Sequence, residues 1–535
     1  MEIEELKLSS YIKSSLEKTW ITFFGRFGRL TEIQIKTIPK VLEKKNVLVV
    51  SPTSTGKTEA IVAPLSELLI REGWNGLSIV YIVPTRALAN DLYSRLKDPL
   101  KELNIKCDFK HSDKPRINYS DLPNLLITTP ESLDSLICRH KDIFSNLRAL
   151  VIDEIHYVDN TYRGDHLRIL INRLQKLSMY KFNIYLLSAT IANPVEVGKR
   201  YVSEFEIVNS YKGRDVDYVI VKNDIDLKNE ILSRNIKKIL VFCNYRETTE
   251  MIYSNLKNLF KYYYVFVHHG SLNKKVREEA EEYFKESRYS ICIATSTLEV
   301  GIDIGDIDCV VLYEIPWSLF SFIQRIGRGN RRENVIFSIA KASNEEEVHF
   351  IEQLYNAAKV GVLPREEYYP DYSVVVQQVF SVLYENRSGL RLEELYELLN
   401  PICDLSLLNK ILDYLVDQSY VYKSFDRFKL STFIRDLGEK GKIHSNIPDS
   451  LEYEVIEKTS GKRIGKISGY IDEYFVLGGI PLRVVEINDY KRQIWVEKVK
   501  GNFEAPIFKR KKNIGAFFGY LPNEVKEEML KRTFR

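Results

Sequence analysis

The sequence predicts an α/β protein with two consecutive doubly wound lobes, a winged-helix domain and a small, mainly β C-terminal domain. Three observations lead to this prediction. Buried strand runs alternate with longer helical patterns up to about residue 207, and the same alternation repeats to about residue 362. Three amphipathic helical patterns and a hairpin pattern follow, and short strands separated by turn residues occupy the rest. Strand–helix alternation builds parallel sheets with crossover helices.

Length and composition fit a folded protein of several domains. The 535 residues exceed what one hydrophobic core supports, and 44% hydrophobic with 28% charged residues excludes a fibrous or largely disordered chain. The net charge is 77 − 73 = +4, so contacts to nucleic acid must come from local patches. No apolar run approaches the ~20 residues that span a membrane, and we expect a soluble, cytoplasmic protein without membrane contact. The 6 cysteines include no CxxC pair, which excludes the usual zinc and iron–sulfur spacings.

The first lobe is expected over residues 1–207 and the second over residues 208–362. The buried strands of the first lobe are NVLVV, SIVYIV, NLLIT, ALVID and IYLLS. Those of the second lobe are KILVFC, YVFVH, SICIAT and CVVLY. Doubly wound sheets bind ligands at the carboxyl ends of their strands, so the residues directly after these runs are the candidate site residues.

The C-terminal third is expected to form two small domains. Residues 363–432 contain the helical patterns SVVVQQVFSVLYEN, RLEELYELL and LSLLNKILDYLV, and then SYVYKSFDRFKLS alternates around Asp426 as a hairpin does. Three helices and a hairpin predict a winged helix. Residues 433–535 contain short strands separated by turn residues, which indicates a small antiparallel barrel or sandwich.

A phosphate-binding loop is the first candidate site. In NVLVVSPTSTGKTEA a buried strand runs into a loop that ends in Gly56, Lys57 and Thr58 and opens a helix. Backbone N–H groups at such a helix start cradle phosphate oxygens, the lysine reaches the β and γ phosphates, and the threonine ligates Mg²⁺. Ser51 stands where the motif usually begins with glycine. A bare GK[ST] also occurs in ordinary turns, and the strand–loop–helix context favours the nucleotide site.

A pair of carboxylates is the second candidate site. In LRALVIDEIH a buried strand presents Asp153 and Glu154 at its carboxyl end. Asp153 can hold the metal ion through water, and Glu154 can polarise the water that attacks the γ-phosphate. The alternative is that both acids cap the helix that follows.

Ten motifs occur in the order typical of superfamily 2 helicases, and they extend over most of residues 25–335. They are RLTEIQ, the phosphate loop, PTRALAND, TTPES, DEIH, SAT, VFCNYRE, HHGSL, ATSTLEVGID and QRIGRGNRR. RGDHL at 163–167 and SATIANP at 188–194 are most similar to the Lhr (large helicase-related) group. The resemblance implies two RecA-like lobes with ATP and Mg²⁺ bound between them.

The resemblance also implies which residues bind and hydrolyse ATP. Gln34 would read the adenine edge, and Arg328 and Arg331 would reach the γ-phosphate as arginine fingers together with Gln324. These three lie at i, i+4 and i+7, which is one face if the segment is helical, and a basic solvent-facing helix is the alternative. Asn330 stands where the family usually has glycine. The implied nucleotide-binding set is Gln34, Ser51, Thr53, Ser54, Thr55, Gly56, Lys57, Thr58, Gly301 and Asp303, and the implied metal ligands are Thr58 and Asp153.

Loops at strand ends in both lobes are implied to bind nucleic-acid phosphates, and such contacts do not read bases. Ser188 and Thr190 are implied to relay hydrolysis to this grip. The run Lys509–Lys512 is either a further backbone contact or a solvated turn. The implied nucleic-acid-binding residues are Pro84, Thr85, Arg86, Thr129, Pro130, His269, Gly270 and Thr295.

From these features we expect an ATP-dependent helicase that moves 3′ to 5′ on single-stranded DNA. Its expected substrates are tailed or forked duplexes and RNA:DNA hybrids, in repair or recombination at the nucleoid, with protein partners that the sequence does not identify. A CRISPR-associated helicase subunit, an RNA helicase, and a nucleic-acid-binding scaffold with an inactive ATPase are the alternatives.

Overall fold

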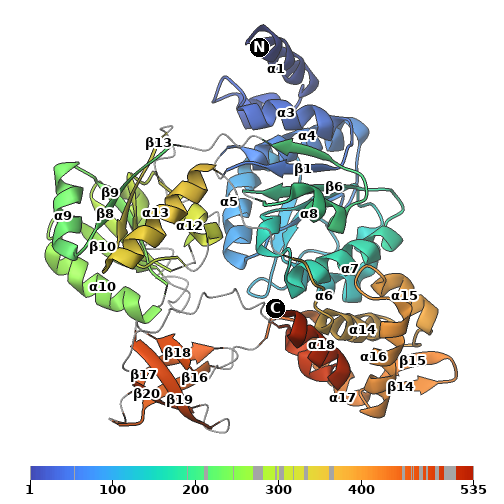
Figure 1. Ribbon diagram of the computed structural model, residues 1–535. Helices are drawn as coiled ribbons and strands as arrows, with labels where there is room; N and C mark the ends of the chain where they lie inside the picture. The colour runs from blue at the N-terminus through green and yellow to red at the C-terminus, as the bar shows by residue number, and fades with distance from the viewer. Residues whose placement is uncertain are drawn as a thin grey trace.

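Two parallel-sheet lobes lie side by side, and a helical module and a small β-sheet follow them, as the computed structural model shows (Figure 1). The two predicted RecA-like lobes are therefore confirmed. The structure describes residues 2–52, 55–189, 191–209, 215–244, 246–268, 281–295, 298–299, 306–316, 319–329, 335–360, 367–448, 452–459, 461, 463–468, 474–477, 480–488, 493–498 and 514–533.

The first lobe is built on a seven-stranded parallel sheet in the order β3-β4-β2-β5-β6-β1-β7. Alternate residues of each strand point to opposite faces, so helices on both sides give two separate cores. One core packs against α1 (Glu2–Ser15), α2 (Trp20–Phe24), α3 (Glu32–Leu42), α4 (Lys57–Glu72) and α5 (Arg86–Glu102), and the other against α6 (Pro130–His140), α7 (Tyr162–Leu177) and α8 (Pro194–Tyr201). The strands are β1 (Val47–Val50), β2 (Ile79–Ile82), β3 (Cys107–Lys110), β4 (Leu125–Thr128), β5 (Ala149–Ile152), β6 (Asn183–Ser188) and β7 (Glu206–Asn209).

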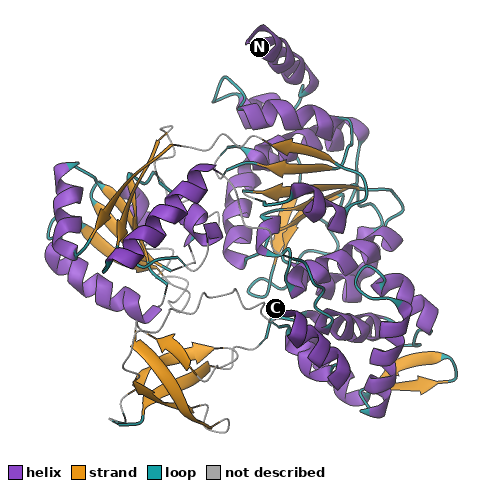
Figure 2. Ribbon diagram, viewed as in Figure 1, coloured by secondary structure: helices purple, strands orange, loops and turns teal. Residues whose placement is uncertain are grey.

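The second lobe has a six-stranded parallel sheet in the order β10-β11-β9-β12-β13-β8. It contains the four predicted strands, and β8 and β13 extend it on one side. Helices again cover both faces, as α9 (Asp224–Ser233) and α10 (Arg246–Leu259) lie opposite α12 (Leu319–Ile326) and α13 (Glu345–Val360) (Figure 2). The strands are β8 (Asp215–Val221), β9 (Lys238–Phe242), β10 (Tyr264–His268), β11 (Ser290–Ala294), β12 (Cys309–Leu312) and β13 (Val335–Lys341).

A C-terminal helical module, residues 367–448 with 514–533, follows the lobes. It begins with three helices and a hairpin, in the order expected of a winged helix. Its core also includes Ile434, Ile443, Phe517 and Leu521, so the predicted boundary at residue 433 is wrong. The chain leaves this core after residue 448 and returns to it at residue 514. The elements are α14 (Ser373–Glu385), α15 (Leu392–Leu399), α16 (Leu405–Asp417), β14 (Val421–Ser424), β15 (Arg427–Leu430), α17 (Thr432–Glu439) and α18 (Asn523–Thr533).

The excursion between those two segments forms a five-stranded sheet in the order β17-β16-β20-β19-β18. β16 and β20 pair in parallel, so the sheet is mixed and not antiparallel as predicted. Its strands are β16 (Glu452–Glu457), β17 (Arg463–Ser468), β18 (Tyr474–Leu477), β19 (Ile480–Asn488) and β20 (Gln493–Lys498). None of the helices in the described ranges is long and apolar enough to cross a bilayer.

Candidate nucleotide site and nucleic-acid groove

The predicted phosphate loop connects β1 to α4 in the first lobe. Gly56 caps α4 with φ of +85°, and a Cβ there would come within 2.2 Å of Gln34 Nε2. Only glycine therefore fits both the left-handed backbone and the space. Lys57 Nζ donates hydrogen bonds to the carbonyl oxygens of Ser51 (2.6 Å) and Pro52 (2.9 Å), so the loop folds around the ammonium group. Within the loop, Thr55 donates to the Pro52 carbonyl, and Thr53 and Ser54 lie outside the described residues.

Gln34 ties the start of α3 to the same loop. Its Nε2 donates to the Gly56 carbonyl (3.3 Å), and its Oε1 accepts from Thr31 N (3.0 Å) in a capping box. The side chain is buried. The structure thus brings Gln34 to the nucleotide loop, and its contact with adenine stays a prediction.

The two predicted carboxylates lie at the carboxyl end of β5, beside Lys57. Tyr81 donates its hydroxyl to Asp153 Oδ2 (2.8 Å), and Glu154 N donates to Asp153 Oδ1 (2.8 Å). Burial and the charge of Glu154 raise the pKa of Asp153 to about 6. Burial also lowers the pKa of Lys57, against the pull of both acids. Two acids and one lysine therefore share a small buried volume.

Glu154 is held in a conformation that needs a reason. Its φ of 47° is left-handed, which is rare for a residue other than glycine, asparagine or aspartate. Its Oε2 is buried and accepts no hydrogen bond from the described residues, and His156 Nδ1 lies 3.4 Å from it. Strained backbone and unsatisfied buried oxygens concentrate at functional sites, which fits a carboxylate held ready for water.

The donor set fits Mg²⁺ bound to a triphosphate. Mg²⁺ takes oxygen ligands from one or two protein groups and the rest from water and phosphate. The Thr58 hydroxyl is hydrogen-bonded to Tyr81, whose hydroxyl also holds Asp153, so the two predicted metal ligands flank one tyrosine. Tyr81 lies inside a buried strand, where no sequence pattern pointed to this role.

The second lobe contributes Arg328. Burial and, to a smaller extent, the charge of the Arg328 guanidinium group lower the pKa of Lys57, so the two side chains lie within electrostatic range of each other at the seam between the lobes. Arg328 Nη2 donates to the Glu299 carbonyl (2.5 Å). Because α12 ends at Ile326, Arg328 lies in the following turn, and the prediction of one helix face shared with Gln324 is wrong. Gln324 is buried in α12, and Arg331, Gly301 and Asp303 lie outside the described residues.

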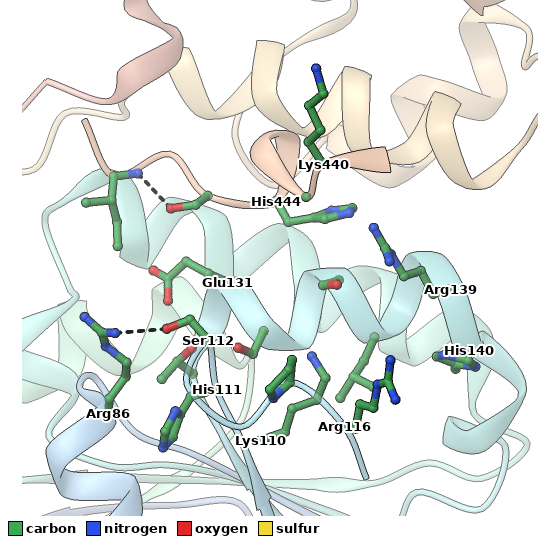
Figure 3. A pocket seen from close by; sticks show the side chains of 18 of the residues that line it. Arg86, Lys110, His111, Ser112, Arg116, Glu131, Arg139, His140, Lys440 and His444 are labelled. Atoms are coloured by element: carbon green, nitrogen blue, oxygen red, sulfur yellow. Dashed lines mark hydrogen bonds between the residues drawn. The ribbon is translucent and has the colours of Figure 1, made fainter. Parts of the chain in front are cut away.

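A groove of about 980 Å³ runs between the first lobe and the C-terminal helical module (Figure 3). Four of the residues predicted to bind nucleic acid line it together: Pro84, Thr85, Arg86 and Thr129. Thr85 caps α5 through Leu88 N (3.2 Å), so this loop has a fixed geometry.

The remaining predicted contacts lie elsewhere. Pro130 begins α6 and is buried, and Thr295 follows β11 in the second lobe. His269 and Gly270 are outside the described residues, as are Thr190 and the run Lys509–Lys512. Ser188, which is expected to relay hydrolysis to the nucleic-acid contacts, touches the DEIH motif directly. Its Oγ lies 2.8 Å from Nδ1 of His156.

Further groove residues were not predicted. Lys110, Arg116, Arg139 and His140 come from the first lobe, and the other wall is formed by residues 439–447. Lys110 ends the short strand β3, which gave no buried-strand signal, and Arg116 and the adjacent pair Arg139 and His140 belong to none of the ten motifs.

Comparisons with known proteins agree with this geometry. Residues 31–197 match the DEAD/DEAH box helicase family and residues 223–333 match the helicase conserved C-terminal domain. The ATP-dependent helicase Lhr-Core of Methanocaldococcus jannaschii is 31% identical over 86% of this chain and 61% of its own length. The chain thus spans about three fifths of that relative.

Two solved structures share the fold. The Mycobacterium smegmatis helicase Lhr bound to ssDNA and AMP-PNP has a TM-score of 0.70 and 23% identity, over 81% of this chain and 62% of that one. The DUF1998 helicase MrfA bound to DNA has a TM-score of 0.66 and 21% identity, over 92% and 73%. Both alignments extend beyond the two lobes, so the fold likeness includes part of the C-terminal region.

Proposed function

Since this chain belongs to the Lhr-type ATP-dependent helicases, we propose that it is an ATP-driven motor that moves 3′ to 5′ along single-stranded DNA. Tailed or forked duplexes and RNA:DNA hybrids are the proposed substrates for unwinding, in DNA repair or recombination at the nucleoid. The observation on which this proposal depends is the seam where Lys57, beside Asp153 and Glu154 of the same lobe, lies within electrostatic range of Arg328 of the other.

Each residue at the seam has a distinct task in hydrolysis. Thr58 and Asp153 would hold Mg²⁺, which when bound neutralises charge on the β and γ phosphates. Lys57 binds the phosphate oxygens, and Glu154 orients the attacking water and takes up its proton. Arg328 supplies positive charge to the transferring phosphoryl group only when the lobes are closed. Hydrolysis therefore depends on closure, and closure in turn depends on the bound nucleotide.

The groove is the proposed binding site for the nucleic-acid strand. The hydroxyl and basic groups of Thr85, Arg86 and Thr129 suit phosphate contacts, which hold a strand without reading its sequence. The Lhr structure was solved with ssDNA and the MrfA structure with DNA, which supports a DNA strand in this chain's groove.

A strand-displacement assay on 3′- and 5′-tailed duplexes tests the proposal. We expect displacement of the 3′-tailed duplex only, and Glu154→Gln should bind ATP but displace nothing. Glu102→Gln is the matched control, because Glu102 is exposed at the end of α5. Displacement from 5′ tails alone would refute the polarity, and full-rate unwinding by Glu154→Gln would refute its role.

ATPase stimulation by single-stranded DNA and by RNA of equal length separates the alternatives. Stimulation by RNA alone would favour the RNA helicase. Absence of turnover with saturating DNA would favour the inactive scaffold.

A further inference from the structure

A buried lysine in the groove has no partner among the described residues. Lys110 ends β3, is 7% exposed and lines the groove (Figure 3). No described side chain accepts a hydrogen bond from its Nζ or forms an ion pair with it, and no acid contributes to its electrostatic environment. Buried charges are normally paired, because an unpaired charge loses its hydration. The partner of Lys110 must therefore come from the groove.

Its nearest charged neighbours are also basic. Arg139 and His140 end α6 and line the same groove. Burial, and then the charge of Arg139, lower the pKa of Lys110 to about 8. Burial and the charges of Lys110 and Arg139 lower the pKa of His140. The charges of Lys110 and Arg139 thus repel each other, and both disfavour the protonated form of His140.

The acids of the groove are already engaged. Glu131 accepts two hydrogen bonds from Arg163 (2.7 and 3.1 Å), and Glu439 forms an ion pair with Arg387 (3.5 Å). Arg86 differs from Lys110 in this respect, because it donates to Asp113 (2.6 Å). Lys110, in contrast, has no acidic partner among the described residues.

An aromatic pair adjoins these cations. The rings of Tyr119 and His140 are stacked, with centroids 3.8 Å apart, and Tyr119 is 38% exposed in the groove. Cations that hold phosphates beside rings that stack on bases are the two elements of single-strand binding surfaces. This combination favours a polynucleotide over a free inorganic anion.

We propose that Lys110, Arg139 and His140 bind a backbone phosphate of the nucleic-acid strand, with Tyr119 beside them for a base. This site rests on the proposed function, and it lies in the same groove as the helicase-motif residues Thr85 and Thr129.

The two walls of this site belong to one fixed unit. Asp134 of α6 is fully buried and accepts hydrogen bonds from Arg173 (2.6 Å) and from three α14 side chains, Gln377 (2.9 Å), Gln378 (3.0 Å) and Ser381 (2.6 Å). Arg139 Nη2 also donates to the Gly438 carbonyl (3.2 Å) of the opposite wall. A phosphate held here stays with the first lobe and the module while the second lobe moves. The site is therefore a grip that moves with the first lobe and the module as one unit.

Fluorescence anisotropy with labelled oligo-dT, measured between 50 and 300 mM salt without nucleotide, tests the site. Lys110→Met keeps the apolar stem and removes the charge. We expect roughly ten-fold weaker binding and a salt slope smaller by about 0.7, the value for one phosphate contact on a single strand. Tyr119→Ala should weaken binding about ten-fold with an unchanged slope, because stacking releases no counterion.

Lys106→Met is the matched control. Lys106 precedes the other end of β3, is exposed and lies outside the groove, so affinity and slope should not change. If Lys110→Met lowers the melting temperature, His140→Gln replaces it, because His140 is partly exposed and its removal should also weaken binding.

The outcomes separate the two proposals. If the wild type does not bind oligo-dT, the proposed function fails. If the wild type binds and Lys110→Met matches it in affinity and slope, only the phosphate site fails. Inorganic phosphate that competes with oligo-dT in the wild type at constant ionic strength, but not in Lys110→Met, would reassign the site to a free anion and overturn the strand contact.

Discussion

Removing the charge of Glu154 should change how Mg·ATP binding depends on pH. Burial and Glu154 together raise the pKa of Asp153 to about 6, against the opposing effects of Lys57 and Tyr81. A metal ion binds the ionised carboxylate, so when the pH is below this pKa Asp153 must lose a proton before the metal ion can bind. The affinity for Mg·ATP is therefore highest well above pH 6, and it decreases as the pH falls through 6 and Asp153 becomes protonated. Glu154→Gln removes one of the two causes, so the pKa of Asp153 should fall toward its ordinary value.

The magnitude follows from the titration. With a pKa of about 6, Asp153 is ionised in about nine tenths of molecules at pH 7 and in about one tenth at pH 5, so the wild-type Kd for Mg·ATP should rise about ten-fold over that range. In Glu154→Gln the Kd for Mg·ATP should rise less than about three-fold between pH 7 and pH 5. The variant should also hydrolyse ATP roughly 10²–10⁴-fold more slowly, the usual contribution of a general base.

Equilibrium titration with a fluorescent ATP analogue at excess Mg²⁺ and constant ionic strength measures this difference. The terminal phosphate of ATP takes up a proton near pH 6 as well, but it does so equally for both proteins, and the ratio of their Kd values cancels it. Glu102→Gln should follow the wild type. Parallel pH dependence in the wild type and in Glu154→Gln would refute the electrostatic coupling between the two acids.

Three further predictions concern other parts of the molecule. Arg328→Ala should lower kcat roughly 10³-fold or more with nucleotide binding retained, and an unchanged steady-state ATPase rate would exclude it from the site. Arg173→Met should weaken the docking of the helical module by up to about 3–5 kcal/mol, because it removes the guanidinium group that pairs with the buried carboxylate of Asp134, and unaltered resistance to limited proteolysis would contradict this. Affinity for oligo-dT should fall as the pH rises from about 7 to 9, because Lys110, beside Arg139 and His140, loses its proton in that range, and Lys110→Met should lack this dependence.

Much of the fold could be predicted because the strands of a doubly wound sheet are buried on both faces and appear as apolar runs. The strand β3 was not predicted, because it lacks such an apolar run. It is an edge strand with the sequence CDFK, and three of its four residues are only half-buried. The boundary of the helical module was missed because residues 517–529 return to a core begun at residue 374. Hydrophobic patterning reports local structure, and it contains no signal for such a return.

The candidate site likewise contains residues that the local sequence predicted and residues that it did not. The phosphate loop and the two acids follow buried strands directly, so local sequence predicted them. The position of Tyr81 against Asp153 depends on the pairing of β2 with β5, which are not consecutive in the chain. The early end of α12 had a local cause, because Gly327 and Gly329 flank Arg328 and glycine disfavours a helix.

The nucleotide site and the groove share one strand, which bears on how the proposed motor works. Tyr81 of β2 holds Asp153, and three residues later the same strand has led into the groove loop at Pro84. Because β2 is buried and paired with β4 and β5, these two points cannot shift independently. The Asp134 network fixes the module to the same block. Nucleotide-driven motion must therefore occur at the seam with the second lobe. Contacts from that lobe, such as Thr295, change while the first-lobe grip holds, and the strand advances when the first-lobe grip then releases.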